Sequence, residues 1–598
     1  MAVNLRETEG SSSIQWRHWS QEAFDVAQAQ DQPVLLSISA VWCYWCHVME
    51  ETTFSDDEVA SFVNDNFVAI LVDNDHRPDV NARYNVGGWP TTAFLTPHGG
   101  SIAGATYLPA DQFLSMLVEI KRAYDEDKAG IYDQAAQIHR QRQEYLGRVA
   151  ATGEPDRRLV DVIARRMAGA HDARNGGFGE DPKFPSAPIL KLFLHLYRTT
   201  GEAFYAAILR KTLDAMMSGE LWDEAEGGFF RYCAQVDWTE AQHEKMVEDN
   251  LSLAGVYLDA GIVLEEPAYL KVANNTIDFL LTTLLDRQAG GFRGSQGAHS
   301  EYFELSNAER RIRSAPEPDP FCYASWTCHA ISLLLDAAWK LPRPALAEIA
   351  SGLLGGLAAR ASRGNLSHAF GSDGSPSSQL TGNGELLCDW VAYLNALTDG
   401  FIALPDRPDY LERAVEVVKF LDENFCDVTR GGYFDVQAEP QAVGYMRLRE
   451  KPLPENTVMA EALLKLHYAT GDKQYLMRAE HVLRAYVEAN RDFGEHAASY
   501  AVAVDHFLHP LVEITVEGPP TEAKANELAL AASRVAYPHV IIKPLPGAEG
   551  TTAMAHVCVE TLCFPPVYEA DQLADSVTEA LEGPQQSGSS IFENFVSF

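Results

Sequence analysis

The stretch that decides the fold of the N-terminal part runs from Pro33 to Met49 and reads P-V-L-L-S-I-S-A-V-W-C-Y-W-C-H-V-M. It is an apolar run of strand length that ends in a cysteine pair and enters a helix. With Cys43 at the strand-to-helix turn and Cys46 in the first helical turn, unpaired backbone N–H groups and the helix dipole favour a thiolate. The pattern therefore predicts that Cys43 is a nucleophile and that Cys46 resolves the mixed disulfide.

The segments that follow are typical of a domain in which strands and helices alternate. They read as a helix at residues 55–64, a strand at 67–72 and a helix start at 80–84. The sequence G-G-W-P-T-T-A-F-L-T-P then begins at Gly87 and leads into a second apolar strand that ends in a Pro/Gly turn.

The tryptophan before the C-x-x-C motif and the later Pro-Thr pair resemble the thioredoxins. The resemblance implies an α/β thioredoxin-like domain, expected at residues 1–150, in which Pro90 is cis and faces the disulfide. Trp42 and His47 flank the cysteine pair and complete the candidate redox site.

Two features depart from the thioredoxin pattern. Ser37 stands where thioredoxins usually carry a buried acid, six residues before the first cysteine, which weighs against an efficient proton relay. The bulky Tyr44 and Trp45 lie between the two cysteines and are expected to restrict the partners that reach them.

The sequence C-Y-W-C-H also fits three other interpretations. It matches the attachment pattern of c-type haem, which needs an export signal and a distal ligand. A metal site of Cys43, Cys46 and His47 lacks a clear fourth ligand nearby. In the third interpretation the cysteines only pack in the core. We favour the redox pair, because a turn is a poor core position for Cys43, and expect no cofactor and no metal.

Composition narrows the functional classes. A chain of 598 residues is too long for one hydrophobic core. Its 84 acidic residues against 47 Lys and Arg give a net charge of -37, which opposes binding to nucleic acid or an anionic membrane. No apolar run of about 18 residues and no secretory signal occur, and the nine cysteines do not resemble a secreted disulfide framework. We therefore predict a cytoplasmic protein without nucleic-acid or membrane partners.

Beyond Gly153 the pattern changes to amphipathic stretches with apolar residues three and four apart, which is typical of packed helices. We count twelve such helices, and short turns such as T-G-E at Thr200 join them in pairs. After several odd-numbered helices an aspartate stands four residues before Gly-Gly and an aromatic residue. The repeat predicts an (α/α)6 toroid of six hairpins at residues 151–510, whose cavity opens where these loops cluster. The aspartates are Asp172, Asp223, Asp286 and Asp427.

Polar residues beside these glycine loops are the candidates for function in the toroid. The glycines and aromatic residues themselves are interpreted as structural, since paired glycines permit a sharp turn. An acid such as Glu244 beside His243 fits proton transfer. The candidates are Asp181, Lys183, Gln242, His243, Glu244, Asp249, Asp389, Arg447 and Glu455.

Longer motifs match one known family. They include W-R-H-W-S-Q-E-A-F from Trp16, L-S-I-S-A-V-W-C-Y-W-C-H-V-M-E from Leu36, A-T-Y-L-P from Ala105 and G-G-F-G-E-D-P-K-F-P from Gly176. The chain here resembles a family with a thioredoxin-like head and a six-hairpin toroid, whose animal member is named as a spermatogenesis-associated thioredoxin-like protein. The resemblance implies a toroid similar to six-hairpin glycosidases and N-acylglucosamine 2-epimerase-like enzymes. The family shows P-H-F-E-K-M where this chain has A-Q-H-E-K-M, so the family histidine falls on Gln242.

The pattern changes again after His509. A strand, a helix, two strands and a helix predict a small α/β region at residues 511–598, with a mobile tail from Gly583. Cys558 and Cys563 fit either a second thiol pair or buried free cysteines, and we expect the latter.

These observations support one main hypothesis and two alternatives. The first is a thiol–disulfide oxidoreductase or redox-responsive protein that acts on a protein thiol or disulfide. The second is a carbohydrate-active enzyme or sugar-binding protein whose toroid cavity holds a small, sugar-like molecule. The third is a scaffold without catalysis.

Overall fold

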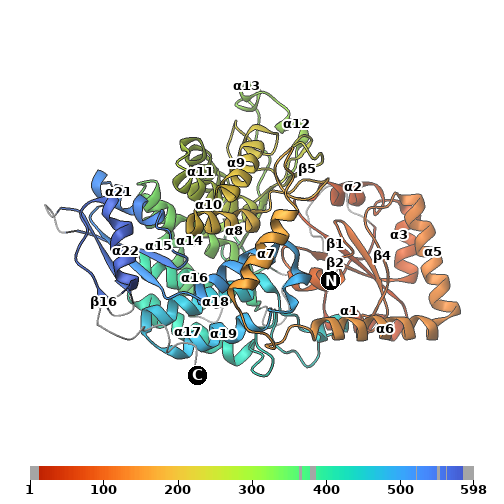
Figure 1. Ribbon diagram of the computed structural model, residues 1–598. Helices are drawn as coiled ribbons and strands as arrows, with labels where there is room; N and C mark the ends of the chain where they lie inside the picture. The colour runs from red at the N-terminus through yellow and green to blue at the C-terminus, as the bar shows by residue number, and fades with distance from the viewer. Residues whose placement is uncertain are drawn as a thin grey trace.

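The computed structural model describes residues 13–362, 366–377, 385–519, 521–547, 552–559 and 562–582. The N-terminal domain, in red and orange, and the C-terminal region, in dark blue, lie at opposite ends of a large helical body (Figure 1). The tail predicted from Gly583 lies outside the described residues. Within the described ranges, no helix has the length and hydrophobicity of a membrane span.

The N-terminal domain is built around a four-stranded sheet in the order β2-β1-β3-β4. Strand β1 is parallel to β2 and antiparallel to β3, and all six of its residues are buried, because helices cover both faces of the sheet. The arrangement confirms the predicted α/β thioredoxin-like fold. Its strands are β1 (Val34–Ser39), β2 (Val68–Asp73), β3 (Thr91–Leu95) and β4 (Ser101–Ala105). Its helices are α1 (Gln21–Gln30), α2 (Tyr44–Thr52), α3 (Asp57–Asn66), α4 (Pro78–Tyr84), α5 (Ala110–Glu126) and α6 (Lys128–Leu146).

Twelve long helices form two concentric rings around one hydrophobic core. Each inner helix contacts the next, and the last contacts the first, so the ring closes and confirms the predicted (α/α)6 toroid. The inner helices are α8 (Ala187–Thr200), α10 (Val247–Val263), α14 (Ala324–Lys340), α16 (Leu387–Ala403), α18 (Leu453–Thr470) and α20 (Ala497–Phe507). The outer helices are α7 (Arg157–Gly169), α9 (Ala203–Ser218), α11 (Pro267–Phe279), α15 (Ala345–Ala361), α17 (Asp409–Asn424) and α19 (Lys473–Arg484).

Each glycine loop is fixed by an ion pair between its aspartate and a cation. The Lys245 ammonium lies 2.7 Å from Asp223 and donates to the Gly227 carbonyl oxygen at 2.8 Å. Gly227 has φ +78, and a Cβ atom there would lie 2.6 Å from the Asn275 carbonyl oxygen on the next outer helix, so a larger residue does not fit. The equivalent pairs are Lys183 with Asp172, Arg293 with Asp286, and Lys451 with Asp427.

The N-terminal domain docks on the mouth of the toroid where the inner helices begin. The Tyr84 ring stacks on Tyr445 with centroids 5.2 Å apart, and the Tyr84 hydroxyl accepts the Tyr445 N–H at 2.8 Å. Arg83 forms an ion pair with Asp435, and Tyr445 enters the core of the N-terminal domain. The predicted opening of the toroid is therefore covered by the domain that carries the cysteines.

The C-terminal region is a small α/β unit with its own core, as predicted. Its sheet has the order β14-β13-β15-β16. Cys558 and Cys563 face each other across β15 and β16 and form a disulfide, so the expectation of buried free cysteines is wrong. The elements are β13 (Val512–Glu517), α21 (Ala523–Ser533), β14 (Val540–Leu545), β15 (Met554–Val559), β16 (Leu562–Cys563) and α22 (Leu573–Glu582).

Candidate functional site

The cysteine turn lies between the end of β1 and the start of α2. Cys43 is the residue that caps α2, and its sulfur accepts the backbone N–H of Cys46 at 3.2 Å. The two cysteines form a disulfide. Because the first N–H groups of a helix carry partial positive charge, this position stabilises a thiolate on Cys43 when the bond is reduced.

The start of β3 lies beside the cysteine turn. Ile38 of β1 pairs with Thr91 of β3, and the Trp89–Pro90 peptide bond just before it is cis, as the thioredoxin resemblance implies. The Trp89 ring lies 5.5 Å from the Trp42 ring and packs against the cysteine cluster. The loop of Pro90 and the cysteine pair therefore form one site.

Residues of the toroid cover this site. Cys43 is 4% exposed and Cys46 1%, whereas Tyr44 and Trp45 between them are about half exposed. Met246, which precedes α10, packs against the cysteine cluster. The disulfide therefore faces the toroid and not open solvent.

Arg231 is the cation that the toroid places at the redox site. Its guanidinium carbon lies 4.4 Å from the centroid of the Trp42 ring and 5.3 Å from that of Trp89. Among the described residues no carboxylate forms an ion pair with it, so its charge is free to act on the cysteine turn. Cation–π contacts of this kind contribute about 0.5 to 2 kcal/mol each.

Asp75 is an acid that is hydrogen-bonded to Trp42, the residue before Cys43. Its carboxylate accepts the Trp42 indole N–H at 2.8 Å. Burial, and then the negative charge of Asp73, raise the pKa of Asp75 to about 7. Ser37, at the position where thioredoxins usually have an acid, is buried and its hydroxyl has no partner in the described part of the chain. Asp75 is thus the group that can hold a proton here.

His368 of the toroid joins Asp75 to the inner helices. Its Nε2 lies 2.8 Å from the Asp75 carbonyl oxygen and its Nδ1 lies 2.9 Å from the Asp389 carboxylate. Both partners accept hydrogen bonds, so both ring nitrogens carry protons. Burial alone would lower the pKa of His368, but the charge of Asp389 outweighs it and raises the pKa. His368 is therefore an imidazolium that holds the domains together.

The same imidazole belongs to a group with metal-binding residue types. Ligand atoms of His368, Cys388 and Asp389 lie within 4.8 Å of one another. A metal ligand must offer a free nitrogen lone pair, and neither ring nitrogen of His368 has one in this arrangement. These residues fit an ion pair better than a metal site.

A second set of acids lies in the first turns of two inner helices, α10 and α18, which stand on opposite sides of the ring. Burial, and then the charge of Glu248, raise the pKa of Asp249 to about 7. Burial also raises the pKa of Glu455 to about 7, and Glu248 adds to this shift. A cavity of about 270 Å³ is lined by Glu455 and His496. These carboxyl groups can hold or release a proton near neutral pH.

The other candidates lie in different environments. Lys183 is fully buried in a structural ion pair with Asp172. Glu244 is 6% exposed, burial raises its pKa, and its Oε2 has no partner among the described residues. His47 contacts the Val41 carbonyl oxygen, and Arg447 donates to the Ala442 carbonyl oxygen. Gln242 lies in the pairing of β5 with β6, and the His243 ring packs on Phe230. Asp181 is exposed and precedes the cis Pro182.

Sequence reasoning did not find Arg231, Glu248, Met246 or His368. Met246 ends the motif A-Q-H-E-K-M but was given no role, and the other three stand in no motif. Arg231, Met246 and His368 reach the N-terminal domain only because the two domains dock. Asp75 lies in the acidic segment after β2, and that enrichment in aspartate was its only signal.

Replacing Asp249 with asparagine is expected to stabilise the protein increasingly as pH rises from about 4 to about 7. In this interval the native carboxyl keeps a proton that the unfolded chain has lost, so wild-type stability falls relative to the variant by up to about 1.4 kcal/mol per pH unit. Urea unfolding at several pH values measures the difference. Asp406→Asn, at an exposed position, is the matched control. A difference that does not vary with pH would show that Asp249 titrates normally.

Comparisons with known proteins agree with the two-part architecture. Residues 5–143 match the Thioredox_DsbH family, described as a protein of unknown function, DUF255. Spermatogenesis-associated protein 20 of Mus musculus is 30% identical over 345 residues, which cover 54% of this chain and 42% of that protein. The thiol:disulfide interchange protein DsbD of Yersinia pestis is 34% identical over 98 residues, 15% of this chain and 16% of that protein.

The crystal structure of D-mannose isomerase has a TM-score of 0.45 and 12% identity, covering 56% of this chain and 86% of that one. The chain spans less than half the length of these curated relatives. Residues 5–143 are thus similar to the Thioredox_DsbH family, and about half of the chain is similar to spermatogenesis-associated protein 20.

Proposed function

We propose that the N-terminal domain is a thiol–disulfide oxidoreductase whose redox site is completed by the toroid. The observation that carries the proposal is the position of the Cys43–Cys46 disulfide, at the first turn of α2 and beside the loop of Pro90. The similarity to a thiol:disulfide interchange protein over 98 residues supports it. Arg231, stacked on Trp42, adds a positive charge that favours the thiolate form of Cys43.

The reaction transfers two electrons from the cysteine pair to a partner disulfide. The Cys43 thiolate attacks one partner sulfur, the partner S–S bond breaks, and one partner thiolate leaves. Cys46 then loses its proton to that thiolate and attacks Cys43, which forms the Cys43–Cys46 bond and releases the second partner sulfur as a thiolate. The reverse sequence oxidises a partner dithiol.

The coverage of the cysteines restricts which partners can react. With Cys43 4% exposed, a partner must be a small disulfide or the loop that carries Arg231 and Met246 must move. Buried access of this kind favours a narrow range of partners over general protein reduction.

Trapping of the mixed disulfide tests the proposal. In the reduced Cys46→Ser variant, Cys43 is expected to form a stable adduct with glutathione disulfide or a protein partner, whereas Cys43→Ser forms none. Cys426→Ser, which removes a half-buried cysteine of the toroid, is the matched control and should behave as wild type. The wild-type pair is expected to titrate within about -270 to -120 mV, the range of thioredoxin-like proteins. Absence of both the adduct and a titration in this range would refute the proposal.

We propose acid–base chemistry on a small, sugar-like molecule as a second function, located in the toroid. Asp249 and Glu455 favour it, because two carboxyl groups on opposite sides of the ring have pKa values near neutral. A thermal-shift screen of sugars tests it, since a ligand at about 100 times its dissociation constant stabilises by about 2.7 kcal/mol. A stabilising sugar that loses turnover, but not binding, in Glu455→Gln supports this function, and a screen without any shift contradicts it.

A further inference from the structure

A second cavity lies at the end of the toroid opposite the redox site. Its volume is about 570 Å³, which is within the range of sites for small organic ligands. It is lined by the last turns of α10 and α14, by the middle of α18, and by residues of α21 and β14. No function proposed above uses it, because Asp249, Glu455 and the cysteine turn all lie at the mouth that the N-terminal domain covers.

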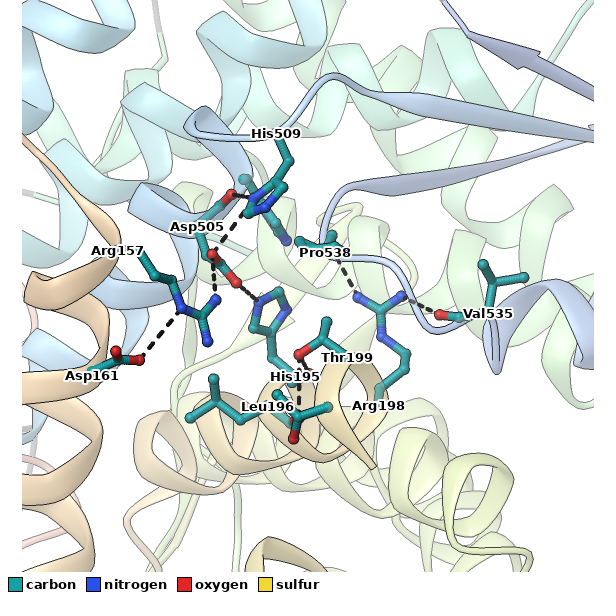
Figure 2. A network of polar contacts seen from close by, with 12 residues as sticks. Arg157, Asp161, His195, Leu196, Arg198, Thr199, Asp505, His509, Val535 and Pro538 are labelled. Carbon is teal, nitrogen blue, oxygen red and sulfur yellow. Dashed lines mark hydrogen bonds and ion pairs between the residues drawn. The ribbon is translucent and has the colours of Figure 1, made fainter. Parts of the chain in front are cut away.

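The C-terminal region closes this end through specific contacts. Arg198 of α8 donates hydrogen bonds to the carbonyl oxygens of Val535 at 3.2 Å and Pro538 at 3.0 Å, as Figure 2 shows. The His506 ring of α20 stacks on His539 with centroids 4.9 Å apart. The C-terminal region therefore covers part of this end of the ring and lines the cavity, here called the chamber, with residues of α21 and β14.

Every carboxylate that lines the chamber already has a cationic partner. Asp259 and Asp336 each lie 2.7 Å from the Lys340 ammonium. Glu461 lies 2.9 Å from His506, whose charge outweighs the burial of Glu461 and helps to lower its pKa to about 2. Each acid of the chamber thus has a cation beside it, and Asp259 and Asp336 share one ammonium.

His195 also lines the chamber, but Asp505 engages it. Asp505 is fully buried, accepts from His195 at 2.7 Å and forms an ion pair with Arg157 at 2.7 Å (Figure 2). This network fixes α20 against α7 and α8. His195 is thus paired within the protein, whereas the lysines of the chamber take no part in this network.

Lys191 lines the chamber and takes part in none of these ion pairs. It lies in the second turn of α8, and no ion-pair or hydrogen-bond partner for its ammonium occurs in the described parts of the chain. Its side chain keeps accessible surface inside the chamber. Burial lowers the pKa of Lys191 although the charges of Asp259 and Glu248 oppose this. Lysines at helix carboxyl ends, such as Lys340, complement the helix dipole, but Lys191 is far from that end of α8.

Apolar side chains form much of the remaining wall. Leu194 lies one turn from Lys191 on α8, and Val502, Val540 and Ile542 line the chamber from α20 and β14. The Lys191 side chain is exposed to the space of the chamber, so a bound anion would pair with its ammonium while an apolar body packs on these side chains. The chemistry of the chamber thus matches a molecule with one acidic group and an apolar body.

We infer that this chamber binds a small organic monoanion with an apolar body, whose acidic group pairs with Lys191. A carboxylate and a sulfonate can both pair with Lys191, so a sulfonate probe tests the inference without the natural ligand. The inference does not depend on the redox chemistry, because the chamber and the cysteine turn lie at opposite ends of the ring.

Two fluorescent probes of nearly the same shape test the inference on the full chain. 1-Anilinonaphthalene-8-sulfonate carries one negative charge, and N-phenyl-1-naphthylamine has a similar apolar body without it. The sulfonate is expected to bind one per chain and at least tenfold more tightly than the neutral probe. Lys191→Met should weaken the sulfonate at least tenfold and change the neutral probe less than twofold. Lys419→Met, at an exposed position, is the matched control and should change neither.

The ratio of the two probes' affinities for the wild-type protein does not depend on how any variant folds. Equal affinity of the two probes for the wild-type protein would overturn the inference, as would sulfonate binding that Lys191→Met leaves unchanged. Lys191→Arg retains the charge and should keep most of the preference for the sulfonate. Loss of both probes to the same extent in Lys191→Met would mean that Lys191 supports the chamber without pairing with the anion, and would also overturn it.

Discussion

Replacing Arg83 with methionine is expected to lower the free energy of unfolding by about 3 to 5 kcal/mol and to release the N-terminal domain from the toroid. The Arg83 side chain is fully buried and donates to Asp435 through both terminal nitrogens, at 2.6 and 3.1 Å. It also donates to the carbonyl oxygens of Tyr445, Asp79 and Leu448. Methionine would remove the counter-ion of Asp435 and all of these donors, although the Tyr445 carbonyl and the Asp435 carboxylate each keep one backbone N–H, from Leu448 and Glu450.

Urea unfolding and limited proteolysis of the segment between α6 and α7 measure the two parts of this effect. Arg83→Lys should be nearly as damaging, because an ammonium has three donors and cannot reproduce the planar geometry of guanidinium. Arg140→Met, at an exposed position of α6, is the matched control and should change stability by less than about 0.5 kcal/mol. A similar small change for Arg83→Met would mean that the other contacts between the two domains are sufficient to hold them together.

Much of the fold could be predicted because its signals are local. The hydrophobic run before Cys43 has the length of a buried strand, and the cysteine turn must follow it. In the toroid the spacing of apolar residues predicted twelve helices, and twelve long helices form the two rings in the described part of the chain. Aspartate and paired glycines marked the loops, since a positive φ is needed there.

The neighbourhood of the redox site could not be predicted in this way. Asp75 and His368 are 293 positions apart and meet only because the N-terminal domain docks on the toroid. Arg231 reaches Trp42 for the same reason. Docking depends on the shapes of two surfaces, and no period along the chain reports them. The site residues predicted from the sequence therefore include Cys43, but not Arg231, whose guanidinium lies over the neighbouring Trp42 ring.

The second disulfide shows a different limit. Cys558 and Cys563 are paired by the register of β15 with β16, and β16 has only two residues. A strand that short has no detectable alternation, so spacing alone left two free cysteines as the simpler expectation.

Replacing Asp223 with alanine is expected to destabilise the protein by about 3 to 5 kcal/mol. Asp223 is the counter-ion of two buried cations, Lys245 at 2.7 Å and Arg310 at 2.9 Å. The Lys245 side chain has no exposed surface and its ammonium lies within 5.2 Å of three aromatic ring centroids, so water cannot replace the carboxylate. Urea unfolding monitored by circular dichroism gives the loss in free energy.

The other glycine loops supply matched controls, because each has one aspartate and one cation. The Asp172 and Asp427 side chains are 17% and 15% exposed, against 3% for Asp223, so Asp172→Ala and Asp427→Ala should cost only about 1 to 2 kcal/mol. Equal losses at the three positions would mean that the loops depend on hydrogen bonds that backbone N–H groups donate to the aspartate and not on the ion pairs. Adding Lys245→Met to Asp223→Ala separates the two causes, since removing the unpaired ammonium should restore part of the stability, whereas lost backbone hydrogen bonds would not return.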